Sequence, residues 1–164
     1  MGRMVAGLKP RGFTWVITDR LAVSERVGGS GFQHRRVRRE EEITWLVEEA
    51  GINAVVSMLP SNQNLLAYRE AGIATYSIPI GQDLTAKDVD TFFKTLSKAT
   101  AQSSARVLVH REAIDDTVGG LLGGFLVVSG LVKDPILALA VIQQILGRAL
   151  GPEGRSLIPE SAVS

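Results

Sequence analysis

Four carboxylates and one imidazole occur in two short segments of this chain, and together they could bind a divalent metal ion. The groups are Asp83, His110, Glu112, Asp115 and Asp116. Carboxylate oxygens with one imidazole suit Mg²⁺ or Mn²⁺, and a metal-bound water could attack a phosphate ester without a thiol. The spacing matches no known metal motif, however, and a histidine at the end of a strand is more often a hydrogen-bonded structural residue. We therefore expect no metal and no cofactor, and keep Asp83, His110, Asp115 and Asp116 as candidates for an alternative function, a metal- or water-based phosphoester hydrolase.

A short buried strand must position the main group of these residues. Val107 to Val109 are apolar and lead into His110, a loop follows, and an apolar helix begins near Thr117. The other predicted strands cover residues 13–18, 21–24, 52–59 and 73–80, and the other predicted helices cover 40–50, 61–71, 85–101 and 135–150. After an initial pair of edge strands, strands and helices alternate. This order predicts an α/β domain of three layers, with a mostly parallel central sheet flanked by helices.

Length and charge exclude several classes of protein. The chain has 164 residues, a formal net charge of +1 and no cysteine. One domain of this size can bury a sufficient core without disulfides. The balanced charge predicts no nucleic-acid partner, and the lack of cysteine excludes thiolate metal sites and thiol nucleophiles.

The domain boundaries follow from the same patterns. We expect an N-terminal tail over residues 1–12, one domain over 13–158 and a C-terminal tail over 159–164. Residues 1–18 contain no apolar run of signal-peptide length. The uncharged stretch 118–132 is shorter than the roughly 20 residues that a membrane-spanning helix needs. The sequence thus predicts a cytoplasmic protein with no membrane partner.

The segment around His110 resembles the phosphate loop of the tyrosine and dual-specificity phosphatases, His-Cys-x-x-Gly-x-x-Arg-(Ser/Thr)-Gly. His110 and Gly119 match this pattern. Arg111 stands at the position of the nucleophilic cysteine, Ile114 at the glycine, Thr117 at the phosphate-binding arginine and Val118 at the hydroxyl residue. The order of segments 13–17, 21–24, 49–59 and 71–83 is also similar to a compact dual-specificity phosphatase, and it puts Asp83 where the general acid sits.

The resemblance implies the phosphatase fold without its reaction. In that family a thiolate attacks phosphorus, backbone N–H groups and an arginine hold the phosphate, and an aspartic acid protonates the leaving oxygen. Arg111 has no nucleophilic lone pair at neutral pH, and Thr117 offers one hydroxyl in place of a guanidinium group. We therefore expect no catalytic residues and no cysteine-dependent phosphatase activity. The degenerate loop positions are His110, Arg111, Glu112, Ala113, Ile114, Asp115, Asp116 and Thr117.

A catalytically inactive member of this family would act as a binding or regulatory module. We expect Arg111 to pair with Asp83, Asp115 or Asp116 and to fill the former pocket, because the loop carries three carboxylates against one guanidinium group. The expected partner is a protein that contacts the rim of this pocket, and binding of phosphate or a phosphoprotein would be weak. The sequence does not specify the oligomeric state.

Two other segments have simpler explanations. The glycines of residues 118–125 lack both the P-loop lysine and the spacing of a dinucleotide-binding fingerprint, so we expect them to let a helix pack closely on the sheet. The basic run 34–39 could contact nucleic acid or an acidic partner, but Glu40, Glu41 and Glu42 follow at once. We expect a solvated helix entrance there.

Overall fold

The computed structural model describes residues 7–31, 34–61, 64–81 and 83–160 of the chain. Within them the strands are β1 (Thr14–Ile17), β2 (Leu21–Ser24), β3 (Ala54–Ser57), β4 (Ala74–Ser77) and β5 (Val107–His110). The helices are α1 (Arg36–Glu48), α2 (Leu65–Glu70), α3 (Ala86–Ala99), α4 (Asp116–Val128), α5 (Pro135–Leu146) and α6 (Pro152–Ser156).

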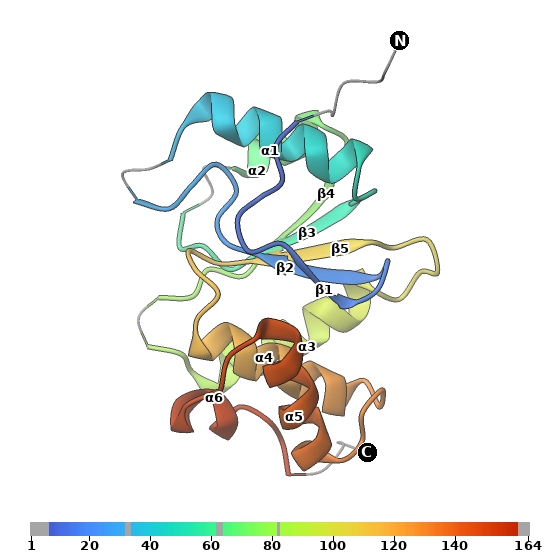
Figure 1. Cartoon of the computed structure of the whole chain (residues 1–164), viewed down its shortest axis with the longest axis vertical. Coiled ribbons are helices and arrows are strands. Elements are labelled where there is room, and N and C mark those ends of the chain that lie inside the picture. The colour runs from blue at the N-terminus through green and yellow to red at the C-terminus, as the bar shows by residue number, and fades with distance from the viewer. Residues whose placement is uncertain (1–6, 32–33, 62–63, 82, 161–164) are drawn as a thin grey trace.

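The five strands form one sheet in the order β1-β2-β5-β3-β4 (Figure 1). The pairs β2–β5, β5–β3 and β3–β4 are parallel, and only β1 runs antiparallel to its neighbour β2. Every residue of β2, β3 and β5 is buried, which explains their continuous apolar sequence. The mostly parallel sheet predicted from the sequence is confirmed.

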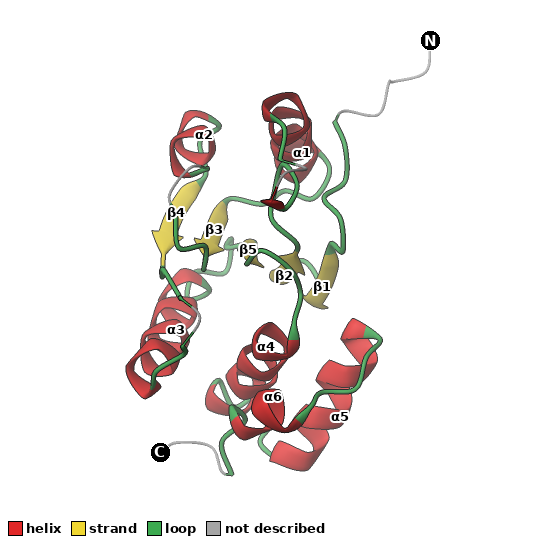
Figure 2. Cartoon of the chain, turned by 90° about the vertical axis from the view of Figure 1, so that its left-hand side faces the viewer, coloured by secondary structure: helices red, strands yellow, loops and turns green. Residues whose placement is uncertain are grey.

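Helices cover both faces of the sheet, as Figure 2 shows. Helices α1 and α2 lie on one face, and α3, α4, α5 and α6 lie on the other. The first core cluster contains Val107 and Val109 of β5 together with Phe92 of α3 and Leu121 of α4. The second contains Leu108 of β5 with Leu46 of α1 and Tyr68 of α2. Alternate residues of one strand thus supply the two cores, so β5 lies at the centre of the three layers.

Two of the predicted helix starts were wrong. Helix α1 begins at Arg36 instead of residue 40. Helix α2 begins at Leu65 instead of residue 61. Helix α6 was not predicted, because a segment of five residues is too short to show helical periodicity. Helix α3 begins close to the predicted residue 85, and Thr85 and Asp88 form a capping box there.

The glycines of α4 face neighbouring helices instead of the sheet, which corrects the sequence-based expectation. A Cβ atom at Gly120 would overlap the carbonyl oxygen of Gly154 in α6, and one at Gly119 would lie 2.5 Å from Leu150 Cδ2. The sheet side of α4 carries large apolar residues such as Leu121 and Phe125. The glycines therefore allow α6 and the end of α5 to approach α4 closely.

The start of the described chain lies against α1. The backbone N–H of Leu8 donates to the carbonyl of Glu41 at 3.0 Å, and the Lys9 ammonium lies 5.8 Å from the centre of the Trp45 ring. Part of the segment expected to be an N-terminal tail therefore packs on the domain. None of the helices in the described ranges has the length and hydrophobicity needed to cross a membrane.

Candidate functional site

The candidate site begins at His110, the last residue of β5. His110 is fully buried, and its Nε2 atom lies 2.8 Å from the hydroxyl of Tyr68. Burial lowers the pKa of His110 to about 4, and the positive charge of Arg26 acts in the same direction. Burial also raises the pKa of Tyr68. Both side chains are therefore uncharged at neutral pH, and His110 does not reach the pocket rim where a partner was expected to touch it.

Arg111, the residue that the sequence resemblance aligns with the family's cysteine, is held by two polar contacts. Its Nη1 atom lies 3.2 Å from Asp115 Oδ2, and its Nη2 atom donates to the carbonyl oxygen of Gly81 at 3.1 Å. Only 17% of the Arg111 side chain is exposed. Of the three carboxylates expected to pair with it, Arg111 contacts Asp115. Through Gly81 it also joins the loop after β5 to the loop after β4.

The two aspartates at the start of α4 have separate structural roles. Asp115 is the N-cap residue, and its Oδ1 accepts from the backbone N–H of Val118 at 2.9 Å. Asp116 accepts from the backbone N–H groups of Gly151 and Gly154, both at 2.6 Å, and so holds the start of α6. The helix N–H of Val118, which an anion would use in a phosphate loop, is thus already bonded to Asp115.

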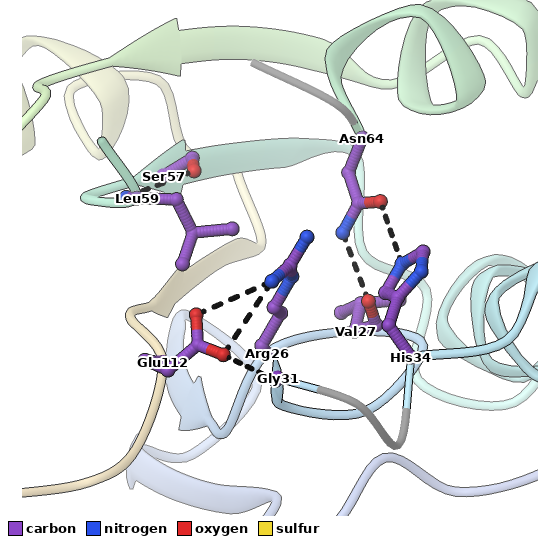
Figure 3. Close-up of polar contacts among 8 residues, drawn as sticks. All are labelled: Arg26, Val27, Gly31, His34, Ser57, Leu59, Asn64 and Glu112. Atoms are coloured by element: carbon purple, nitrogen blue, oxygen red, sulfur yellow. Dashed lines mark hydrogen bonds and ion pairs between the residues drawn. The ribbon is translucent and has the colours of Figure 1, made fainter. Parts of the chain in front are cut away.

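The remaining loop residues are also held by the fold. The Ile114 side chain packs against the first core cluster, and its carbonyl accepts from Arg148 Nη1 at 3.0 Å. Glu112 accepts from the backbone N–H of Gly31 at 2.7 Å and pairs with Arg26 at 3.4 Å (Figure 3). Ala113 is exposed.

Two shallow hollows flank this loop. One, of about 280 Å³, is lined by Pro60, Ile80, Gly81, Arg111 and Glu112. The other, of about 300 Å³, is lined by Asp83, Leu84, Thr117, Glu153, Ser156 and Leu157. Asp83 is exposed and lines the second hollow with Thr117, whereas Arg111 lines the first. The two residues that the sequence resemblance aligns with the family's acid and nucleophile therefore line different hollows.

The four metal candidates are not gathered into one site. His110 is buried against Tyr68, Asp115 caps α4, Asp116 caps α6, and Asp83 is exposed. No cluster of three or more histidine or acidic side chains suited to a metal ion occurs within the described ranges. Each candidate instead has a structural bond of its own or lies apart from the others.

Sequence reasoning missed the residues that the loop after β2 and helix α2 bring to the segment after β5. Arg26 and Gly31 contact Glu112 from the segment after β2, and Tyr68 reaches His110 from α2. The run of glycines at 28–31 was a usable signal, since Gly28, Gly29 and Gly31 all have positive φ angles. Nothing in the sequence, however, connects that loop to a residue more than eighty positions later.

The overall fold of the chain is similar to that of solved phosphatase structures. Kinase associated phosphatase with serine at its catalytic cysteine matches with a TM-score of 0.68 and 16% identity, over 93% of this chain and 94% of that one. The core catalytic domain of a PP-IP phosphatase from S. cerevisiae, in complex with citrate, gives a TM-score of 0.67 at 13% identity, over 93% of this chain and 86% of that one. This chain has the dual-specificity phosphatase fold.

A third similar structure, a putative phosphatase from Shewanella putrefaciens CN-32, gives a TM-score of 0.64 at 17% identity over 91% of this chain and 89% of that one. No protein-family sequence model matches the chain, and no curated protein matches it. Identities this low show the fold alone. Within this fold, the loop from β5 to α4 follows a buried strand and precedes an apolar helix.

Proposed function

We propose that this protein is a catalytically inactive tyrosine-phosphatase-like protein that serves as a binding or regulatory module in the cytoplasm. The observation that carries the proposal is the position of Arg111. The sequence resemblance aligns this guanidinium group with the family's thiolate, and two contacts hold it, one to Asp115 and one to the Gly81 carbonyl. Such a group can neither attack phosphorus nor leave its place without breaking two polar contacts.

The surroundings of Arg111 support loss of phosphate binding as well. Thr117 supplies no second guanidinium group, and Asp115 takes the Val118 N–H. Glu112 and Asp115 also add negative charge that opposes a phosphate dianion. These carboxylates offset the attraction of Arg111 and of the α4 N-terminus, so an incoming phosphate would have to displace Asp115 from both.

The first test is turnover of p-nitrophenyl phosphate by the purified protein. We expect none above buffer, with or without Mg²⁺ or Mn²⁺, and none in Arg111→Cys, because Thr117 still lacks the guanidinium group that stabilises the transferred phosphate. Turnover that requires added metal and disappears in Asp83→Asn would reject the proposal in favour of a hydrolase with replaced chemistry.

The second test is thermal unfolding in phosphate or tungstate against chloride at equal ionic strength. A ligand at a hundred times its Kd would add about 2.7 kcal/mol of stability. We expect no such increase. An increase that Arg111→Ala abolishes would show that the loop still binds phosphate.

The binding role is tested by partner capture. The partner is expected at the rim formed by exposed or half-buried groups, chiefly Asp83, Arg111 and Ala113. Arg111→Glu should abolish capture, whereas Glu48→Lys, on the far helical layer at the end of α1, should leave it unchanged. Capture that survives Arg111→Glu together with Asp83→Lys, in protein that still folds, would contradict a role for this surface.

A further inference from the structure

Strand β4 has backbone groups that the sheet does not use. It forms one edge of the sheet and pairs with β3, and no described helix or strand lies beyond that edge in Figure 2. The backbone N–H groups of Ala74 and Ile78 donate, at 3.0 and 2.8 Å, to carbonyl oxygens in or next to β3. Alternate residues of a parallel strand direct their N–H and C=O groups to the same side. Those of Thr75 and Ser77 therefore point outward from the sheet.

The sequence of β4 lacks the features that usually block a sheet edge. Edge strands are commonly protected by a charged residue, a proline or a bulge. The residues of β4, Ala-Thr-Tyr-Ser, include no charge and no proline, and they pair with β3 in regular register. The edge can therefore accept the backbone of an added extended chain. Because β4 is short, side-chain contacts must strengthen such pairing.

A hollow beside this edge can supply those contacts. It has a volume of about 420 Å³ and is lined by Ala74 and Tyr76 of β4 together with the end of α3. Tyr76 packs against the core cluster that contains Phe92 of α3, so its side chain lies on the α3 side of the sheet. Residues opposite each other on neighbouring strands put their side chains on the same face. In an added strand, the residue opposite Tyr76 therefore directs its side chain toward the hollow.

The charges around β4 favour an acidic chain. Lys98, in the last turn of α3, is exposed and lines the hollow, and none of the ion pairs within the described ranges includes it. The described residues that line the hollow include no acidic side chain. On the other face of the sheet, Arg69 of α2 donates from Nε to the Thr75 hydroxyl at 3.2 Å. Cations thus flank β4 on both faces, and a carboxylate complements them.

We propose that the edge of β4 and the hollow beside it form a docking site for an extended, acidic segment of a partner protein. The segment adds a strand next to β4, and its backbone bonds Thr75 and Ser77. A glutamate opposite Tyr76 enters the hollow and pairs with Lys98.

This site is separate from the loop between β5 and α4. The hollow lies at the start of the parallel strands β3 and β4, where Asn53 and Ala74 line it, whereas that loop follows the end of β5. The inference therefore goes beyond the function proposed above and does not depend on it.

The side-chain contact is tested by fluorescence anisotropy with a short, fluorescein-labelled, threonine-rich peptide that has one central glutamate, at fixed ionic strength. Lys98→Gln should weaken binding about two- to fivefold, the range for an exposed ion pair. Lys94→Gln is the matched control and should bind as the natural protein does, because Lys94 is exposed one turn earlier on α3 and lines a different hollow. Replacing the glutamate of the peptide by glutamine should weaken binding to the natural protein by a similar factor, and binding to Lys98→Gln no further. Both lysines are exposed, so neither substitution should unfold the domain.

The backbone contact is tested by amide hydrogen exchange. In the free protein, the amides of Thr75 and Ser77 should exchange faster than that of Tyr76, and the peptide should slow exchange at Thr75 and Ser77. Two further peptides carry one N-methyl group, either at the glutamate or at the next residue. Since only one of two successive N–H groups of a strand faces β4, one of these peptides should lose binding and the other should keep it.

Four results would overturn the proposal. They are no binding of the peptide to the natural protein, equal affinity of Lys98→Gln and Lys94→Gln, unchanged exchange at Thr75 and Ser77 in the bound state, and equal binding of the two N-methylated peptides. Free glutamate that displaces the peptide at the same concentration would also overturn it, in favour of a site for a small carboxylate.

Discussion

The buried imidazole of His110 makes a measurable contribution to the pH dependence of folding. Its pKa is about 4 in the folded protein, against 6.5 for an ordinary histidine. As the pH falls below 6.5, the imidazole of the unfolded chain takes up a proton while the buried imidazole of the folded protein stays neutral. The contribution of His110 to folding stability is therefore fully present above pH 6.5 and is lost as the pH falls toward 4. His110→Gln removes this proton and leaves an amide that can still meet the Tyr68 hydroxyl.

The size of the effect follows from the two pKa values. Each pKa unit corresponds to about 1.36 kcal/mol, so the whole difference is about 3 kcal/mol. Between pH 7 and pH 5, the imidazole of the unfolded chain becomes mostly protonated, whereas the imidazole of the folded protein stays mostly neutral. The natural protein should therefore lose about 2 kcal/mol more than His110→Gln over this interval. That is a large part of the 5 to 15 kcal/mol typical of a domain.

Urea unfolding at pH 7 and pH 5 measures this difference. The natural protein and His110→Gln share every other titrating group, so a difference between their stability losses from pH 7 to pH 5 reports on His110. Tyr68→Phe is the control, because it removes the hydroxyl contact and keeps the buried imidazole; its loss between pH 7 and pH 5 should resemble that of the natural protein. If His110→Gln loses as much stability as the natural protein, then His110 is protonated in the folded state and the reasoning is wrong.

Two further changes test the packing of α6 against α4. Gly120→Ala should destabilise the fold by about 2 kcal/mol or more, because its methyl group overlaps the Gly154 carbonyl, whereas Gly81→Ala has open space and should change the free energy of unfolding by less than about 0.5 kcal/mol. Urea unfolding measures the change in the free energy of unfolding for each variant, and equal changes would show that α6 moves away from α4 with no loss of stability. Asp116→Asn should cost about 1 to 3 kcal/mol, because it weakens the bonds to the N–H groups of Gly151 and Gly154. Hydrogen exchange at the Gly154 amide should become faster in this variant, and unchanged exchange would show that Asp116 does not hold α6.

Most of the fold could be predicted because its signals are local. The apolar runs that form β3 and β5 lie between segments that form helices, and parallel strands need such crossover connections. Asp115 follows Arg111 by four residues in the sequence, near enough for the two side chains to pair. In these cases the residues that decide the structure are close together in the chain.

The start of α1 was mispredicted because a distant contact decides it. Glu42 lies in the interior, where its carboxylate accepts from Gly28 N–H at 3.0 Å and from Arg38. The Arg38–Glu42 pair has the i,i+4 spacing of residues one helical turn apart, which favours a helix that includes Arg38. The helix dipole alone would favour a start among the glutamates, and the buried, bonded carboxylate outweighs it.

The sequence by itself determined the order of the elements and the absence of any cysteine nucleophile, because neither depends on contacts between distant residues. Only the tertiary structure decided what the loop residues contact. Arg26 and Glu112 are 86 positions apart, and His110 and Tyr68 are 42 apart. Two parallel strands and the helices packed on them bring these pairs together, and no local pattern specifies which distant partner a polar side chain will find.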